Sequence, residues 1–345
     1  MEKSIYVLGT TIETGKLVQS LATKFTISGV ITLKSTTNLN NVSGYLNLNN
    51  LLSKRKIPTY EVDSYNLKNE NDFKLITDLK IDILIVYGWQ RLIPTWLLKH
   101  VSIAVIGVHG SPDGISAGRG RSPQNWALIL GANKFYFSLF QLSEGIDSGR
   151  IITSSSYSIL AEDDICTLYR KLTNISVKLI SNFLMDPIAF LESAKIQDGI
   201  VYYYPKRIAD DGAIDWRSKS QSIHNLVRAL TKPYPGAFTF YRNQKISIWK
   251  IEKILESNST EKHKPGVIVS KKGRNDFRVS TSDGYINILE YDHESLLEIK
   301  EGERFTSYSE HEILSSIIKR HYQTYPNLNI SPRLVKYWES LDVRK

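Results

Sequence analysis

The sequence is poor in cysteine and has no long apolar run. One cysteine, Cys166, among 345 residues excludes an internal disulfide framework of the kind that stabilises small secreted domains. The longest apolar stretches, residues 81–87 and 101–108, are far shorter than the roughly 20 residues that span a bilayer. The first residues also lack the basic and then apolar order of a secretion signal. We therefore expect a cytoplasmic protein without a membrane partner, in which Cys166 packs as a small side chain.

The glycine patterns of nucleotide-binding loops are missing as well. Between Gly9 and Gly15 there is one residue too many for a phosphate-binding loop, and Leu17 stands where that loop needs a hydroxyl for Mg²⁺. The G-x-G-x-x-G pattern of dinucleotide-binding folds is also absent. We interpret this segment as a strand-to-helix turn, and we expect neither a nicotinamide nor a metal as cofactor.

Negative charge is scarce relative to positive charge. The net charge of +9 at pH 7 would attract polyanions. The basic residues, however, are dispersed along the chain rather than gathered into one long basic stretch. We therefore expect an anionic small molecule as partner and no nucleic acid.

Up to about residue 190, predicted strands and helices alternate along the chain. This order predicts a Rossmann-like, mostly parallel sheet with helices on both faces. The clearest helix, residues 163–185, has apolar residues three and four positions apart and two aspartates in its first turn. The predicted strands are residues 4–8, 29–33, 59–62, 81–87, 104–108, 135–141 and 150–157, and the remaining predicted helices are residues 13–24, 45–56 and 123–130.

The pattern changes after residue 205. A predicted helix at residues 220–231 is followed by short alternating strands with Asn-Gln and Asp-Gly turns, which indicate a small β-barrel-like domain. We predict a Rossmann-like domain over residues 1–205, a β-rich domain over 206–295 and a helical extension over 296–345. The sequence assigns no role to the extension, which could cap the barrel or contribute to a homodimer interface. The predicted strands are residues 238–241, 245–251, 266–269, 278–280 and 285–288, and the predicted helices of the extension are residues 310–320 and 332–340.

Two polar segments follow neighbouring predicted strands. His109 comes directly after the strand at residues 104–108, and Asp147 lies in the loop after the strand at residues 135–141. Ligands bind at the carboxyl ends of parallel strands, where an imidazole and a carboxylate can form an acid/base pair. The alternative is that His109 makes a structural hydrogen bond and Asp147 is a turn residue.

Several motifs in fixed order resemble one family. They are His109-Gly110-Ser111, Arg119-Gly-Arg121-Ser-Pro-Gln-Asn125-Trp126, Glu144-Gly-Ile146-Asp147-Ser-Gly149, Asp210-Asp-Gly-Ala-Ile-Asp215-Trp216, the Ile223–Leu230 stretch that contains Arg228, and Pro233-Tyr-Pro-Gly-Ala-Phe238. Together they resemble the formyltransferases that use 10-formyltetrahydrofolate, over roughly residues 80–255. The run from Arg119 to Trp126 is most similar to the members that act on sugar nucleotides; the later blocks also occur in methionyl-tRNA members.

The resemblance implies an N-formyltransferase. It would move the formyl group of 10-formyltetrahydrofolate to the amino group of a UDP- or dTDP-linked 4-amino-deoxy sugar, for a surface polysaccharide such as lipopolysaccharide or O-antigen. His109 would stabilise the oxyanion or relay a proton, and Asp147 would hold His109 and a water. The resemblance implies that Tyr87, Gln90, Arg91, Leu92, Ile93, Leu142, Glu144 and Ile146 bind the folate, and that Ser111, Arg119, Arg121 and Asn125 bind the sugar nucleotide. It also implies a structural role for Asp215, Trp216 and Arg228.

The sequence departs from the family at two places. The family has Asn two residues before the histidine, where this chain has Gly107, and side chains two apart face the same side of a strand. Removal of one oxyanion donor typically lowers a rate by about 10²–10³. The segment at residues 112–118 is also two residues longer than the family pattern. A methionyl-tRNA formyltransferase and a module that binds folate or sugar nucleotide without catalysis are the alternatives.

Overall fold

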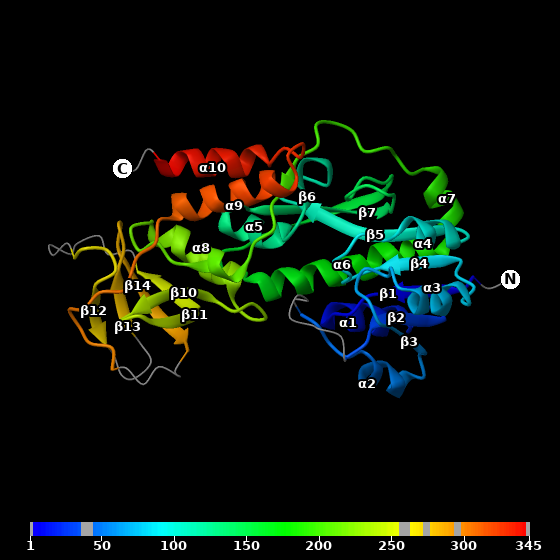
Figure 1. The fold of residues 1–345 in the computed structure, drawn as a ribbon, viewed down its shortest axis with the longest axis horizontal. Helices are drawn as coiled ribbons and strands as arrows, with labels where there is room; N and C mark the ends of the chain where they lie inside the picture. The colour runs from blue at the N-terminus through cyan, green and yellow to red at the C-terminus, as the bar shows by residue number, and fades with distance from the viewer. Residues whose placement is uncertain (1–2, 36–43, 255–262, 272–276, 293–297, 343–345) are drawn as a thin grey trace. The chain divides into compact units, whose positions relative to one another are not determined.

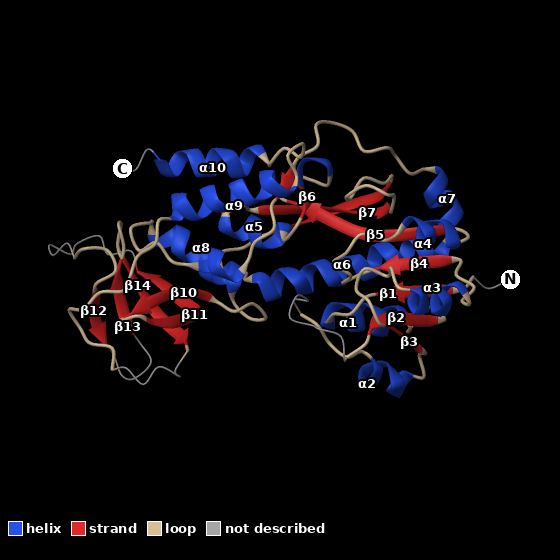
Figure 2. Ribbon diagram, in the orientation of Figure 1, coloured by secondary structure: helices blue, strands red, loops and turns tan. Residues whose placement is uncertain are grey.

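The computed structural model describes residues 3–35, 44–254, 263–271, 277–292 and 298–342. Its chain forms two compact units, and each takes more than one segment of sequence. The first unit comprises residues 1–119, 136–157 and 169–200, and the second comprises residues 120–135, 158–168 and 201–345. Figure 1 labels most of the helices and strands, and Figure 2 distinguishes helices from strands.

In the described residues, a sheet with the strand order β3-β2-β1-β4-β5-β7-β8 forms the centre of the first unit. β1, β2, β3, β4 and β5 pair in parallel, whereas β7 runs antiparallel to β5. The strands are β1 (Ile5–Leu8), β2 (Gly29–Leu33), β3 (Thr59–Val62), β4 (Ile83–Val86), β5 (Ala104–Ser111), β7 (Lys134–Gln141) and β8 (Ile151–Ser158).

Alternate residues of β1 enter two different hydrophobic cores, one on each face of this sheet. Ile5 and Val7 belong to the core that also contains Leu17 of helix α1 (Ile12–Leu21) and Phe183 of helix α6 (Ile165–Met185). Tyr6 and Leu8 belong to the opposite core, which takes in side chains of α3 (Glu70–Thr77) and α4 (Thr95–His100). Full burial of one Val or Leu side chain contributes roughly 1.5–3 kcal/mol. A parallel sheet buried on both faces needs such continuous apolar strands.

The helices of the first unit begin where the sequence offers a capping side chain. Thr11 caps α1 by accepting a hydrogen bond from the Thr14 N–H, and Asn69 caps α3 in the same way through the Asp72 N–H. The predicted helix at residues 45–56 is wrong in length: only α2 (Asn49–Leu52) and a 3₁₀ turn (Ser53–Arg55) form. Leu48 at its N-cap offers no side-chain hydrogen bond, and Lys56 at its end adopts a left-handed φ of 55°.

The second unit contains an antiparallel sheet of the order β10-β11-β14-β13-β12 in the described residues. Its core surrounds Trp216, which is fully buried and whose indole N–H donates to the Thr239 hydroxyl. The predicted fold class, a mostly parallel α/β sheet followed by a small β-rich domain, is confirmed. The strands are β10 (Ala237–Tyr241), β11 (Gln244–Ile254), β12 (Ile268–Lys271), β13 (Phe277–Ser280) and β14 (Tyr285–Tyr291). The helices are α5 (Pro123–Ile129), α8 (Ser220–Leu230), α9 (Glu310–Thr324) and α10 (Pro332–Asp342), and short strands β6 (Arg119–Gly120) and β9 (Tyr203–Tyr204) pair with each other.

The helical extension is an integral part of the second unit. Arg320 of α9 donates to both carboxylate oxygens of buried Asp211, at 2.6 and 2.7 Å. At the start of α9, the Glu310 N–H donates to Asp215 at 3.0 Å and the Glu310 carboxylate accepts from Ser218 at 2.6 Å. The extension therefore packs on the segment that carries Asp211 and Asp215.

Three helices of the first unit were not predicted: α3, α4 and α7 (Pro187–Glu192). These helices are short, and α4 has no side-chain cap to mark its start. Among the helices of the described residues, none is both long and apolar enough to cross a membrane.

Candidate active site

His109 lies on the part of β5 that extends past its parallel neighbour. The pairing of β4 with β5 ends at Val86 and Gly107, whereas the antiparallel pairing with β7 continues to Ser111. His109 faces Ser138 of β7 across this continued ladder. Its side chain therefore stands at the carboxyl end of the parallel strands, the edge where ligands bind in open α/β sheets.

Oxygen atoms face both nitrogens of the His109 ring. Nδ1 lies 3.5 Å from Oδ2 of Asp147, and Nε2 lies 3.0 Å from the carbonyl oxygen of Gly118. The side chains of His109 and Asp147 are 11% and 22% exposed, so the pair is partly shielded yet reachable from solvent. Asp147 has a φ of 47°, a left-handed conformation that is costly for a residue with a side chain. The structure thus brings together His109 and Asp147, the two residues for which the sequence suggested an acid/base role.

Gln197 is a residue of this site that the sequence did not predict. Its side-chain amide donates to the carbonyl oxygens of Asp147 and Gly149 and accepts from Arg119 and Ser116. Gln197 lies in the segment that follows α7, far along the chain from the motifs it joins. No local pattern in the sequence marks it.

Gly107 faces the side chain of Leu142. A Cβ atom placed on Gly107 would lie 2.7 Å from Cδ1 of Leu142 and 3.6 Å from the Val86 carbonyl oxygen. The space that the family's Asn side chain would enter is therefore occupied by a leucine methyl group. Gly107 and Leu142 form a matched pair, and an amide donor has no room there unless Leu142 moves.

The predicted folate segment, residues 87–93, presents some of its side chains inward. Tyr87 is buried and its hydroxyl lies 3.0 Å from that of Thr173; burial raises the pKa of Tyr87 to about 12, so this phenol stays neutral. The Gln90 N–H donates to the Tyr65 hydroxyl, and Arg91 lies over the Tyr65 ring. In contrast, Leu92 is exposed, next to buried Ile93.

Trp89 adds an unexpected donor to this segment. The residue is buried, and its indole N–H has no hydrogen-bond partner among the described residues. A buried donor without an acceptor is costly, and it often marks a place where a water or ligand supplies the acceptor.

The second predicted folate segment, residues 142–147, already makes a main-chain hydrogen bond to the sheet. The Leu142 N–H donates to the Val105 carbonyl at 2.8 Å, so this main-chain donor is already used. Glu144 is exposed and Ile146 is partly buried. The hydroxyls of Ser143 and Ser148 lie 2.6 Å apart and close the loop on itself.

Two of the predicted acceptor residues belong to the same unit as His109. The Ser111 hydroxyl donates to the Gly114 carbonyl and accepts from the Asp113 N–H, so it shapes the turn after β5. Arg119 is 8% exposed and donates through Nη2 to Gln197 at 2.7 Å. Its buried Nε–H has no partner among the described residues.

Comparison with protein families identifies the group to which this fold and site belong. Residues 18–184 match the family described as "Formyl transferase", and residues 207–301 match "Formyl transferase, C-terminal domain". The two matches are in the expected order and together span most of the chain. The chain belongs to the formyl transferase family. The predicted resemblance is confirmed.

Similar proteins include larger chains as well as chains of similar size. The bifunctional polymyxin resistance protein ArnA of Wigglesworthia glossinidia brevipalpis is 33% identical over 223 residues, which are 63% of this chain and 33% of that protein. The N-formyltransferase of Helicobacter canadensis, solved with folinic acid and dTDP-3-aminofucose, has a TM-score of 0.58 and 16% identity over 85% of this chain and 100% of its own. HypX of Aquifex aeolicus with tetrahydrofolic acid has the same TM-score and identity over 96% of this chain and 49% of its own. This chain thus spans a third of its curated relative and half of HypX.

Arg121 and Asn125 belong to the second unit of this formyl transferase family member. The Arg121 N–H donates to the Tyr204 carbonyl. Asn125 is buried; its Nδ2 donates to the Ala229 carbonyl at 2.7 Å, whereas its Oδ1 has no partner among the described residues. The Asn125 amide therefore joins α5 to α8. The motif from Arg119 to Trp126 is divided between the two units.

The predicted structural residues of the second unit are tied into its framework. Arg228 donates through Nη1 to the carbonyl oxygens of Leu160, Ala161 and Asp163. Cys166 corrects the sequence interpretation: its thiol is exposed rather than packed, and it donates to the Lys232 carbonyl at 2.7 Å. Cys166 is the second residue of α6, where the neighbouring Ile165 takes the buried position and the thiol faces solvent.

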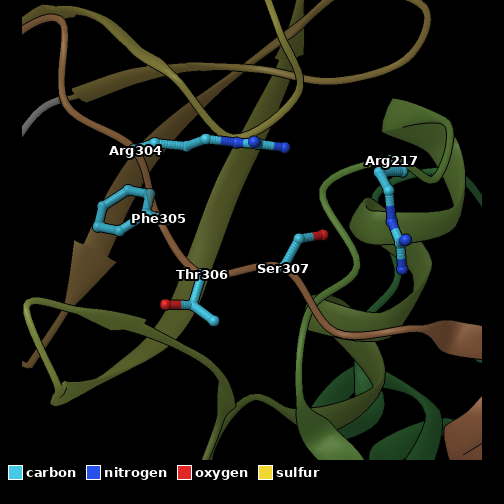
Figure 3. A pocket seen from close by; sticks show the side chains of 5 residues that line it. All are labelled: Arg217, Arg304, Phe305, Thr306 and Ser307. Carbon is cyan, nitrogen blue, oxygen red and sulfur yellow. The ribbon is translucent and has the colours of Figure 1, made fainter.

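A separate hollow of about 380 Å³ lies in the second unit. Figure 3 shows the Arg304 side chain extending toward the side of the hollow where Arg217 lies. Both guanidinium groups already have partners, the Pro265 carbonyl for Arg304 and the Asp215 carboxylate for Arg217. None of the residues that line this hollow was predicted as a site residue. In the described residues, no group of three or more His, Cys, Asp or Glu side chains could hold a metal ion.

Proposed function

We propose that this chain transfers the formyl group of 10-formyltetrahydrofolate to the amino group of a nucleotide-linked amino sugar. The observation that carries the proposal is the His109–Asp147 pair, with 3.5 Å between Nδ1 and Oδ2, at the ligand-binding edge of a formyl transferase family sheet. We propose a UDP- or dTDP-linked 4-amino-deoxy sugar as acceptor, a product destined for a surface polysaccharide and a location in the cytoplasm.

The reaction requires two catalytic functions from the protein: stabilisation of an oxyanion and removal of a proton. An uncharged amine attacks the formyl carbon, negative charge develops on the formyl oxygen, and the attacking nitrogen gives up a proton while the folate nitrogen leaves. A donor must therefore face the developing oxyanion, and a base must lie within reach of the amine. In well-studied enzymes an oxyanion donor contributes about 10²–10³ to the rate, and a general acid or base about 10²–10⁴.

His109 and Asp147 are suited to both oxyanion stabilisation and proton transfer. In the free protein both ring nitrogens face oxygens, Asp147 Oδ2 on one side and the Gly118 carbonyl on the other. The carboxylate orients the ring and supports it when it carries a proton. His109 would then donate to the formyl oxygen or relay the amine proton, and Asp147 would hold the ring and an ordered water.

The folate segments fit a flat ring with polar edges. Exposed Leu92 offers an apolar surface, and the unpartnered Trp89 N–H offers a donor in the same segment. The loop that carries Glu144 supplies further main-chain groups. We propose that the remaining folate-binding residues are Tyr87, Gln90, Arg91, Ile93, Leu142 and Ile146. Buried Tyr87 would act by supporting the shape of the segment.

For the acceptor, Arg119 is the best-supported of the predicted residues. It lies in the same unit as His109, and its Nε–H has no partner among the described residues. A guanidinium group binds phosphate oxygens well, often through two parallel hydrogen bonds. Ser111, Arg121 and Asn125 stay as proposed contacts.

Two measurements on the purified protein test this function. Calorimetry with a stable formyl-folate analogue should report binding of the folate. A panel of UDP- and dTDP-linked 3-amino- and 4-amino-dideoxy sugars, each incubated with 10-formyltetrahydrofolate, should give tetrahydrofolate release and a formyl adduct with one acceptor. Folate binding without turnover on the whole panel would favour a non-catalytic module, for which the Gly107–Leu142 pair is the supporting observation. Absence of folate binding would contradict the proposal.

The net charge of +9 favours methionyl-tRNA as the second candidate acceptor. Binding to a tRNA that neutralises several phosphates weakens steeply as salt rises, because counterions are released on binding. Acceptor KM measured between 50 and 200 mM salt would rise by about 10³ or more for a tRNA with several phosphate contacts. A sugar nucleotide should show only a small change.

A further inference from the structure

The side chain of Gln197 uses its full hydrogen-bonding capacity. Oε1 accepts from Arg119 Nη2 at 2.7 Å and from Ser116 Oγ at 3.3 Å. Nε2 donates to the carbonyl oxygens of Asp147 at 2.6 Å and Gly149 at 2.9 Å. An amide offers two donors and two acceptor sites, and here all four have partners. A surface glutamine rarely makes so many contacts, because ordering its side chain costs entropy.

The orientation of this amide follows from its partners. A guanidinium group can only donate, and a main-chain carbonyl can only accept. Exchange of Oε1 and Nε2 would place two carbonyls against an oxygen and a guanidinium against an NH₂ group. The Gln197 amide therefore has one orientation, in which it accepts from the segment of Ser116 and Arg119 and donates to the loop of Asp147 and Gly149.

The two segments joined by Gln197 are the same two that contact the ring of His109. The segment from Ser116 to Arg119 contains Gly118, whose carbonyl lies 3.0 Å from Nε2 of His109. The accepting loop contains Asp147, whose carboxylate faces Nδ1 of the same ring. Displacement of either segment would change what the ring faces.

Asp147 has particular need of support. Its φ of 47° is left-handed, and its Oδ2 is 3.5 Å from the histidine nitrogen, too far for that contact to hold the loop by itself. The main-chain carbonyl of Asp147 is fixed by Gln197, and the Gln197 segment is fixed in turn to β8. Reciprocal hydrogen bonds of 2.7 and 2.8 Å join Ile151 and Lys195.

We propose that Gln197 is a positioning residue that holds Asp147 and the Gly118 carbonyl on the two sides of the His109 ring. This inference rests on the proposed function, because it assigns a role within the same site. Gln197 does not touch the reacting atoms; it acts through Asp147 and the segment of Gly118.

The first test compares kcat and KM of three variants in the formyl-transfer assay. Gln197→Ala removes all four hydrogen bonds, and Gln197→Glu keeps the acceptor for Arg119 while losing both donors to the Asp147 loop. We expect both to lower kcat by roughly 10²-fold, the loss typical of a displacement of about 1 Å in a catalytic group, with little change in the folate KM. Ile196→Ala is the matched control, since the neighbouring Ile196 side chain is 83% exposed and should leave kcat unchanged.

A double-mutant cycle separates positioning from general stability. In an Asp147→Asn background, Gln197→Ala should lower kcat by clearly less than the roughly 10²-fold expected in the wild-type background, because the part of its effect that is transmitted through Asp147 is already lost there. Losses that multiply independently would overturn the proposal. So would a Gln197→Glu variant with wild-type kcat.

A readout without turnover keeps this inference separate from the proposed function. In protein labelled with ¹⁵N-histidine, the ring signals of His109, assigned by their loss in His109→Ala, should shift in Gln197→Ala and stay in place in Ile196→Ala. A shift without formyl transfer by the wild-type protein would support the role of Gln197 while contradicting the proposed function. Unchanged His109 signals in a folded Gln197→Ala protein would contradict the positioning role.

Discussion

Asp147 and Asp211 show how differently two motif carboxylates can be held. The Asp147 side chain is 22% exposed, has a left-handed backbone and faces a histidine nitrogen at 3.5 Å. The Asp211 side chain is 4% exposed, receives two hydrogen bonds of 2.6 and 2.7 Å from Arg320 and a third from the Ile208 N–H. A buried carboxylate with several hydrogen bonds stabilises a fold, whereas we propose that the partly exposed carboxylate beside a histidine serves the chemistry. Variants of the two should therefore fail in opposite ways.

The largest expected effect is on catalysis at the first carboxylate and its partner. His109→Ala and Asp147→Asn should each lower kcat by about 10²–10⁴, since they remove or misorient the proton-transfer group. Their thermal unfolding midpoints should stay close to that of the wild type, because both side chains are partly exposed and lie at a strand end. Steady-state kinetics together with thermal unfolding measure both quantities. An Asp147→Asn variant with a strongly lowered midpoint and normal kcat would reverse our assignment.

The next effect is on stability at Asp211. Asp211→Ala leaves Arg320 and the Ile208 N–H without their acceptor, and we expect a loss of roughly 3 kcal/mol in the free energy of unfolding. Denaturant titration of Asp211→Ala against the exposed control Asp210→Ala checks this. At a temperature where the variant stays folded, its kcat should equal that of the wild type.

The Gly107–Leu142 pair should show a compensating interaction. Gly107→Asn places a Cβ atom 2.7 Å from Cδ1 of Leu142, the far end of a half-buried side chain, so the cost should lie at or below the low end of the roughly 1–3 kcal/mol typical of overpacking. Leu142→Ala should relieve that cost, so the double variant should be more stable than the sum of the single changes predicts. Denaturant titrations of the four proteins measure the coupling. Additive changes would show that position 107 and Leu142 are independent.

The smallest effect concerns acid stability of the second unit. Burial, followed by the charges of Arg228 and Lys253, lowers the pKa of His224 from 6.5 to about 4. Between these pH values His224 is protonated in the unfolded chain and neutral in the folded chain. The free energy of unfolding therefore falls as the pH drops from about 6.5 to 4. The slope from one such site is at most about 1.4 kcal/mol per pH unit, and less here because the ring is partly exposed. His224→Gln should flatten this part of the curve of unfolding free energy against pH; an unchanged slope would contradict the assignment.

Much of the fold could be predicted from the sequence, because it depends on local periodicity. Strands with continuous apolar residues and a long amphipathic helix predicted a parallel sheet buried on both faces, and this sheet is present. The continuation of β5 past residue 108 to Ser111 could not be predicted. It depends on pairing with β7, which is a long-range contact without a local signal.

The candidate site could be predicted only where a motif carries its own geometry. His109 and Asp147 each follow a predicted strand, but β7 runs antiparallel to β5, so the carboxyl ends of these two strands lie at opposite ends of the pair. It is the loop after β7 that brings Asp147 to within 3.5 Å of the His109 ring, and the family motifs rather than the strand ends indicated this pair. Gln197 lies 50 positions after Asp147, and only the fold brings its amide to the Asp147 carbonyl. The motif from Arg119 to Asn125 reads as one unit in sequence, yet the boundary between the two compact units falls directly after Arg119. The motif is continuous in sequence, but only Arg119 belongs to the same compact unit as His109.

The measurement that tests the central claim most directly is formyl transfer by the wild-type protein and by Asp147→Asn, assayed side by side with equal folded fractions. Each protein is incubated with 10-formyltetrahydrofolate and the acceptor identified from the sugar-nucleotide panel, and the formylated product is followed by mass spectrometry. The proposed role of the His109–Asp147 pair predicts transfer by the wild type and a loss of about 10² or more in Asp147→Asn, with folate binding retained. Equal transfer by the two proteins, or no transfer by either with any acceptor, would contradict it.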